Sequence, residues 1–193
     1  MTPKSWLRFP IIGRFIRALW QWDAHQKTRL ILPHIKQGNR ILDVGSGPGT
    51  LAMELFQQDL KPELLDVEDQ SFFPETRARI YDGVIFPYPD QSFDVVLLLT
   101  VLHHAQDPDQ LIREAKRVGK KILILEDVYN NPIQKKVTHW VDSLVNLEFT
   151  GHPHNNRSDG HWKRTFSEMQ LTVEEEQAYP FLAFFRQVLY VLK

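Results

Sequence analysis

The chain of 193 residues contains no cysteine, and this absence removes whole classes of chemistry. Disulfide bonds, thiolate metal sites, iron–sulfur clusters and cysteine nucleophiles all need a thiol. A strong excess of charge is missing as well, because the formal net charge is only -1. A protein that binds nucleic acid by attraction to phosphates is usually distinctly basic. We therefore expect no nucleic-acid partner.

Long hydrophobic runs are also lacking, since none approaches the ~20 residues that a membrane-spanning helix needs. The apolar stretch near the N-terminus is interrupted by Arg14 and Arg17, and no small-residue cleavage site follows it, unlike in a signal peptide. Hydrophobic residues still make up 42% of the chain, which is enough for an ordinary core. We expect one cytoplasmic domain over residues 1–193, with an N-terminal helical cap (1–36) and an α/β core (37–193).

Short apolar runs alternate with segments of helical periodicity along the core. The expected strands are residues 40–44, 61–67, 78–82, 93–99, 121–126, 171–179 and 186–192. The expected helices are residues 50–58, a segment starting at 108, residues 132–149 and a short segment around 161–169. This alternation predicts a Rossmann-like, doubly wound α/β fold: a mostly parallel seven-stranded sheet in a three-layer αβα arrangement. The last two strands are joined by too short a link for a crossover, so the last strand should be antiparallel.

The N-terminal segment, residues 10–35, shows two helical stripes of apolar residues. Asp23 is expected to cap the second helical piece, and Pro33 to bend or end it. Residues 1–22 hold four basic residues and no acid, interleaved with aromatic and aliphatic side chains. This segment could lie on a membrane surface, or it could form a helix that covers a cofactor and shapes an acceptor pocket. The second interpretation is favoured, because a short basic helix is weak evidence of membrane contact.

The stretch ILDVGSGPGT, residues 41–50, places three alternate glycines between a predicted strand and a predicted helix. In parallel α/β sheets such a turn is where a ligand approaches the backbone. Two cofactor classes compete for it. The dinucleotide fingerprint is G-x-G-x-x-G, whereas the spacing here is G-x-G-x-G. Asp43, two residues before Gly45, would be a poor neighbour for a pyrophosphate and a good one for an ammonium group. The turn therefore favours a nucleoside that carries an amino-acid tail.

With these residues in view, ILDVGSGPGT resembles the first motif of class I S-adenosylmethionine-dependent methyltransferases. Residues 81–118, from YDGVIFPYPD to REAKRV, resemble the small-molecule ("type 11") branch of that family. The resemblance covers residues 28–126 well and the rest by topology. Two segments depart from the family pattern: the crossover between Asp66 and Asp82 is short, which predicts a turn in place of a helix, and the segment before the fifth strand is abbreviated.

The resemblance implies a donor site assembled from the strand ends. The methionine part would be held by Asp43 and by the backbones of Gly45, Ser46, Gly47 and Gly49. The ribose hydroxyls would be bound by Asp66, with Val67 beside it, and a carboxylate can accept from two adjacent hydroxyls. The adenine amino group would donate to Asp82, with Gly83 beside it. The sulfonium would lie near Thr100 and Val101.

The reaction implied is methyl transfer from S-adenosylmethionine by direct displacement, with S-adenosylhomocysteine as product, so positioning supplies most of the catalysis. His103 and His104 follow the fourth strand, at the expected mouth of the site, and either could serve as a general base. His104 is favoured by its family position. Proximity alone could also suffice, with both histidines structural.

A second histidine group consists of His152, His154 and His161. Zinc binding by this group is not favoured, because neither cysteine nor a supporting carboxylate pattern accompanies it. The polar stretch that contains it is more typical of a substrate-lid loop. We expect no metal.

Three hypotheses follow for the function. The leading one is methyl transfer to a small molecule, with apolar compounds included. A non-catalytic protein that binds S-adenosylmethionine as a partner is the alternative. A nicotinamide-dependent oxidoreductase is disfavoured by the glycine spacing and by Asp43.

Overall fold

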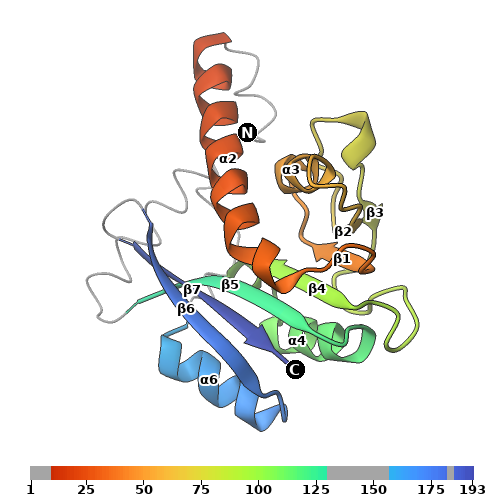
Figure 1. Cartoon of the computed structure of the whole chain (residues 1–193), viewed down its shortest axis with the longest axis vertical. Helices are drawn as coiled ribbons and strands as arrows, with labels where there is room; N and C mark the ends of the chain where they lie inside the picture. Colours follow the sequence, from red (N-terminus) through yellow and green to blue (C-terminus); the bar gives the residue numbers. More distant parts are fainter. Residues whose placement is uncertain (1–9, 130–156, 182–184) are drawn as a thin grey trace.

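The computed structural model describes residues 10–129, 157–181 and 185–193, and its strands form one seven-stranded sheet in the order β3-β2-β1-β4-β5-β7-β6 (Figure 1). The strands are β1 (Ile41–Val44), β2 (Glu63–Asp66), β3 (Arg79–Ile80), β4 (Val95–Leu99), β5 (Ile122–Val128), β6 (Val173–Phe181) and β7 (Phe185–Leu192). The first five strands are parallel, while β7 is antiparallel to both of its neighbours. The predicted mixed sheet with an antiparallel last strand is therefore confirmed.

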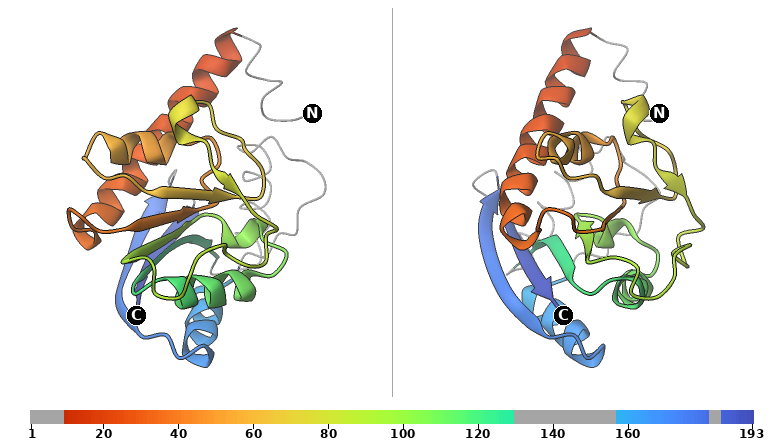
Figure 2. Two further views of the ribbon diagram at one scale, coloured as in Figure 1. Left: turned by 90° about the vertical axis from the view of Figure 1, so that its right-hand side faces the viewer. Right: turned by 45° about the vertical axis from the view of Figure 1, so that its right-hand side comes forward.

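Helices cover both faces of this sheet, which gives the three predicted layers (Figures 1 and 2). One face carries α2 (Pro10–Ile31) and α3 (Thr50–Phe56), and the other carries α4 (Pro108–Val118) and α6 (Asp159–Glu168). Short 3-10 turns complete the described elements: η1 (Leu32–His34), η2 (Pro74–Thr76) and η3 (Leu102–His104). All five residues of β4 are buried, because a central parallel strand is covered on both faces.

Two hydrophobic clusters fill the spaces between the layers. Alternate strand residues such as Ile41 and Leu97 pack with Ile31 and Leu55 in one cluster. The intervening residues, among them Leu42 and Val96, belong to the other cluster, with buried side chains of α4 and α6. Asp43 lies on β1 between Leu42 and Val44, so its side chain points to the face that α2 and α3 cover.

The N-terminal helix corrects one prediction. Asp23 does not cap a second helical piece, because α2 is continuous from Pro10 to Ile31. Inside the helix the Asp23 carboxylate pairs instead with Lys27 at 2.8 Å, one turn further on. Pro33 does end the helix, which passes into η1. The short crossover between β2 and β3 is reduced to η2, as predicted.

Several sequence predictions concern residues that the structure does not describe. The expected helix at residues 132–149, the lid loop with His152 and His154, and the first part of the basic segment 1–22 lie outside the described residues. Among the helices that the structure does describe, none has the length and hydropathy to cross a membrane.

Candidate functional site

The glycine turn joins β1 to α3 at the carboxyl edge of the sheet. Gly45, Gly47 and Gly49 all have positive φ, at 72°, 51° and 77°. A Cβ on Gly45 would overlap the side chain of Val101, and one on Gly49 would overlap Thr76. A Cβ on Gly47 would instead meet only the Gly45 carbonyl oxygen, at 3.9 Å. Packing thus requires the outer two glycines, while the middle one leaves the backbone open to a ligand.

Asp43 is the chemically unusual residue of the site. Its side chain lies in the interior, with only 2% of the residue exposed. Its Oδ2 atom, like the hydroxyl of Ser46, has no hydrogen-bond partner among the residues that the structure describes. Burial raises the pKa of Asp43 to about 7, the charge of Asp66 adds to the rise, and Lys27 opposes it. A buried carboxylate oxygen without a partner is costly, so the geometry fits a cationic ligand group at this point.

Asp66, at the end of β2, ties the glycine turn to the neighbouring strand. Its Oδ2 accepts a hydrogen bond from the Gly47 amide at 2.8 Å, and its Oδ1 accepts from the amides of Val67 at 2.7 Å and Glu68 at 3.4 Å. Burial raises the pKa of Asp66, and these three amide bonds counteract the rise. A carboxylate has about four acceptor positions, so a ligand hydroxyl still has room to donate. The link to Gly47 was not predicted from the sequence.

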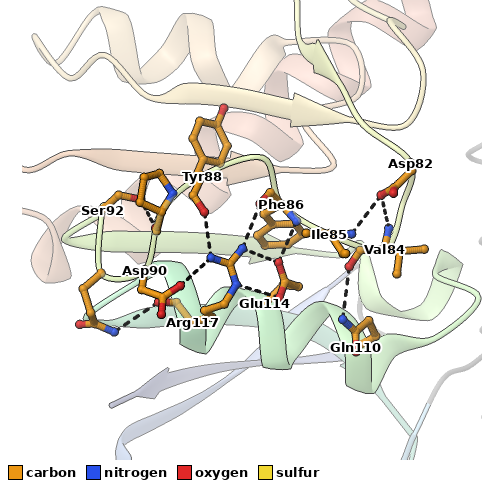
Figure 3. Close-up of polar contacts among 12 residues, drawn as sticks. Asp82, Val84, Ile85, Phe86, Tyr88, Asp90, Ser92, Gln110, Glu114 and Arg117 are labelled. Atoms are coloured by element: carbon orange, nitrogen blue, oxygen red, sulfur yellow. Dashed lines mark hydrogen bonds and ion pairs between the residues drawn. The ribbon is translucent and has the colours of Figure 1, made fainter.

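After Asp43 and Asp66, the third corner of the candidate site lies after β3. The Asp82 carboxylate accepts from the amides of Val84 at 2.8 Å and Ile85 at 3.0 Å, and these bonds lower its pKa (Figure 3). Gly83 has a φ of 80°, and a Cβ there would lie 3.3 Å from Val67 Cγ1. Large apolar side chains are exposed here, with Val67 at 58% and Ile85 at 59%. An ionised acid beside exposed apolar side chains fits a flat heterocycle that carries an amino group.

The end of β4 holds a strained residue. Thr100 has a φ of 56°, which is rare for a β-branched side chain and is found mainly where function requires it. Its amide donates to the Leu125 carbonyl at 2.7 Å. The ammonium group of Lys27 donates to its hydroxyl oxygen at 2.7 Å while pairing with Asp23. Lys27 thus reaches the candidate site from α2. Nothing in the sequence distinguished it from a solvated lysine.

The two candidate bases occupy different environments. His103 is buried, at 1% exposure, and its Nδ1 lies 2.6 Å from Oε2 of Glu126 on β5. The other oxygen of Glu126 accepts from the Leu102 amide at 2.8 Å. His104 is half-buried, with its ring centroid 4.0 Å from that of His103. His103 therefore lies in the interior and not at the mouth of the site, and Glu126 is a partner that the sequence analysis missed. Whether either histidine acts as a base stays a prediction.

Of the second histidine group, only His161 lies in the described part of the chain, exposed on α6. Within residues 10–129, 157–181 and 185–193, no group of three histidine or acidic side chains is arranged to hold a metal ion.

The carboxyl ends of β1, β2 and β4 thus bring together Asp43, the glycine turn, Asp66 and Thr100, while Asp82 lies at the end of β3. A parallel sheet with a glycine turn after its first strand and acids at successive strand ends defines a Rossmann-like nucleoside-binding fold. Residues 42–122 match the family model of the methyltransferase domain. The match confirms, over these residues, the predicted resemblance to class I S-adenosylmethionine-dependent methyltransferases of the type 11 branch.

Two curated relatives are methyltransferases by name, and one solved structure shares the fold. An uncharacterized methyltransferase of Schizosaccharomyces pombe is 35% identical over 129 residues, which are 56% of this chain and 46% of that protein. A demethylmenaquinone methyltransferase of Lactobacillus johnsonii is 33% identical over 120 residues, which are 52% and 49% of the two chains. The chain thus spans about half the length of these curated relatives. The crystal structure of a SAM-dependent methyltransferase from Aquifex aeolicus superposes with a TM-score of 0.60 at 16% identity, covering 84% and 88% of the two chains.

Proposed function

We propose that the protein transfers a methyl group from S-adenosylmethionine to a small-molecule acceptor. The observation that carries the proposal is the buried Asp43 oxygen, which has no partner in the described part of the chain and lies beside the open backbone of the glycine turn. That combination suits the ammonium group of an amino-acid tail. It does not suit a pyrophosphate, which the negative charge of Asp43 would repel.

The remaining parts of the donor match the other corners of the site. Asp66 would accept from a ribose hydroxyl while holding Gly47. Asp82 would accept from the adenine amino group, with Val67 against the ring. Lys27 lies close enough to influence Asp43 and contacts Thr100 directly. A second cation would repel the donor ammonium but attract its carboxylate, so we assign Lys27 to the carboxylate of the amino-acid tail.

When bound, S-adenosylmethionine would supply a methyl group on a sulfonium, so that an acceptor atom can bond to the methyl carbon while the carbon–sulfur bond breaks and the sulfur keeps the electron pair. The chain's own task is to hold the acceptor in line and to exclude water. An acceptor whose nucleophilic atom must lose a proton needs a base. Glu126 engages Nδ1 of the buried His103, so the half-buried His104 is our candidate for that base.

Two observations support a small acceptor. A cavity of about 210 Å³ lies between α2 and the segment after β2, lined by Arg17, Gln21, Thr50, Phe72 and Phe73. Ligand pockets usually measure about 300–1,000 Å³, so this one suits a compact molecule with an apolar part. The names of the relatives point the same way, since they include methyltransferases for demethylmenaquinone, 27-O-demethylrifamycin SV and ajmaline.

The acceptor class is testable with methyl-labelled S-adenosylmethionine and a panel of quinols, phenols, amines and a mixed-sequence oligonucleotide. We expect label on at least one small compound and none on the oligonucleotide. The Thr50→Trp variant, which fills the cavity, should lose transfer while still binding S-adenosylhomocysteine. Label transfer only to the oligonucleotide would overturn the proposed acceptor class.

A further inference from the structure

The loop between β3 and β4 is held by α4 through contacts to its backbone (Figure 3). The guanidinium of Arg117 donates from Nη1 to the Tyr88 carbonyl at 2.8 Å and from Nη2 to the Phe86 carbonyl at 2.9 Å. Nη1 also pairs with the Asp90 carboxylate at 2.8 Å. Two of these three contacts are to backbone carbonyl oxygens. Arg117 therefore fixes the backbone conformation of the loop more than the positions of its side chains.

Glu114 lies one turn earlier on the same helix face. Together Glu114 and Arg117 form what we call the clamp. Its two oxygens accept from Nε and Nη2 of Arg117 at 2.9 and 2.6 Å, which is a two-pronged pair. Oε2 also accepts from the Phe86 amide at 2.8 Å. Only 7% of Glu114 is exposed, and its bonds to Arg117 lower its pKa, so the carboxylate stays charged. The Phe86 backbone is therefore gripped at both its amide and its carbonyl.

The clamp lies directly next to the candidate adenine corner. The amides of Val84 and Ile85 donate to Asp82, and the very next amide, that of Phe86, donates to Glu114. The Phe86 ring is buried and meets Tyr81, at the other end of this short segment, edge-on at 5.5 Å. The Asp82 turn ends at Ile85, and the next residue, Phe86, is already bound by Glu114. A shift at Phe86 must therefore also move the turn that fixes the Asp82 carboxylate.

We propose that Glu114 and Arg117 are positioning residues for adenine recognition: they hold the loop so that Asp82 and Gly83 face the base across Val67. The proposal rests on the donor site described under the proposed function. The pair would touch no part of the donor itself. It acts by fixing the direction in which Asp82 presents its free carboxylate oxygen, since only Oδ1 takes part in hydrogen bonds with other described residues.

The test compares the affinities of S-adenosylhomocysteine and S-inosylhomocysteine, in which a carbonyl replaces the adenine amino group. The wild-type chain should prefer the adenine compound by about tenfold or more, because the inosine compound sets a carbonyl oxygen against a carboxylate. Glu114→Gln keeps the size of the side chain and Arg117→Lys keeps its positive charge, but each breaks the two-pronged pair. Both should reduce the preference to below about threefold, mainly by weakening the adenine compound.

Matched variants separate positioning from stability. Asp94→Asn removes the charge and one of the two acceptor oxygens that bind Lys120 and the Arg40 amide near the opposite end of β4, and should lower the melting temperature without changing the preference. Gln110→Ala removes a weak bond to the Val84 carbonyl and a bond that Gln110 accepts from Arg113 on the same helix, and should lower the preference partially in a chain that folds normally.

Two results would overturn the proposal: a wild-type preference near one, or clamp variants that keep the wild-type preference while melting earlier. A wild-type chain that binds neither compound would instead overturn the donor site on which the proposal rests.

Discussion

Replacing Asp43 by asparagine should stabilise the ligand-free protein and at the same time weaken donor binding. Asp43 is buried, and its Oδ2 has no hydrogen-bond partner in the described part of the chain. Its ionised form is therefore poorly solvated until a cation arrives. Asparagine has nearly the same shape and carries no charge, so it removes this unfavourable term but also the attraction for the donor ammonium.

The size and sign of the effect follow from the pKa. The pKa of Asp43 rises from 3.8 to about 7 on folding. Between these pH values the folded chain keeps a proton that the unfolded chain has lost, so the free energy of unfolding falls as the pH rises through this window. At about 1.4 kcal/mol per pH unit, the loss approaches about 4 kcal/mol above pH 7. Asp43→Asn should regain a large part of it.

Urea unfolding at about pH 5 and about pH 8, with the wild type and the variant side by side, measures this directly. The variant should be the more stable protein, by a margin that grows from the lower to the higher pH. Its affinity for S-adenosylhomocysteine should be about tenfold to a hundredfold weaker. A margin that does not change with pH, or a variant less stable than the wild type at the higher pH, would refute the reasoning.

Three further predictions test other parts of the site. Asp66→Ala should weaken S-adenosylhomocysteine binding by about tenfold or more, and it should also lower the melting temperature because it leaves the Gly47 amide without its acceptor. Titration and thermal melting check the two effects, and unchanged affinity would mean that the ribose lies elsewhere. Lys27→Met should weaken binding of S-adenosylmethionine by about tenfold but leave decarboxylated S-adenosylmethionine within about twofold, and equal losses for both would exclude Lys27 as the carboxylate partner. Gly49→Ala should destabilise the fold by about 2 kcal/mol or more in denaturant titration, since φ is 77° and the new methyl group would overlap Thr76; a neutral result would contradict the packing of the turn.

The order of the core elements was predictable because each leaves a strong local signal. The run VVLLL has to be a strand buried on both faces, and Asp107 followed by Pro108 marks a helix start, where the Asp107 carboxylate does accept from the Gln110 amide. The error in the N-terminal helix came from reading Asp23 alone. An acid in a helix interior can be stabilised by a lysine four residues later, and local capping preference does not outweigh that pair together with the buried residues Ala24, Thr28 and Ile31 further along the helix.

The site was predictable where a single segment determines it. Asp43 and the three glycines lie within one short turn, so their spacing was informative. Lys27 meets Thr100 across 73 positions of sequence, and Glu126 meets His103 across 23. These contacts depend on how α2 and β5 lie against β4, which no local pattern records. The clamp on α4 was hidden for the same reason, because it binds backbone atoms that have no sequence signature.

The central claim is that the glycine turn binds a nucleoside with an amino-acid tail. Calorimetric titration of the wild-type chain with S-adenosylhomocysteine, and separately with NAD, tests it most directly. We predict saturable binding of one S-adenosylhomocysteine per chain, stronger at about pH 8 than at about pH 6 because Asp43 must be ionised, and no comparable binding of NAD. The absence of S-adenosylhomocysteine binding at either pH, or tighter binding of NAD, would contradict the account.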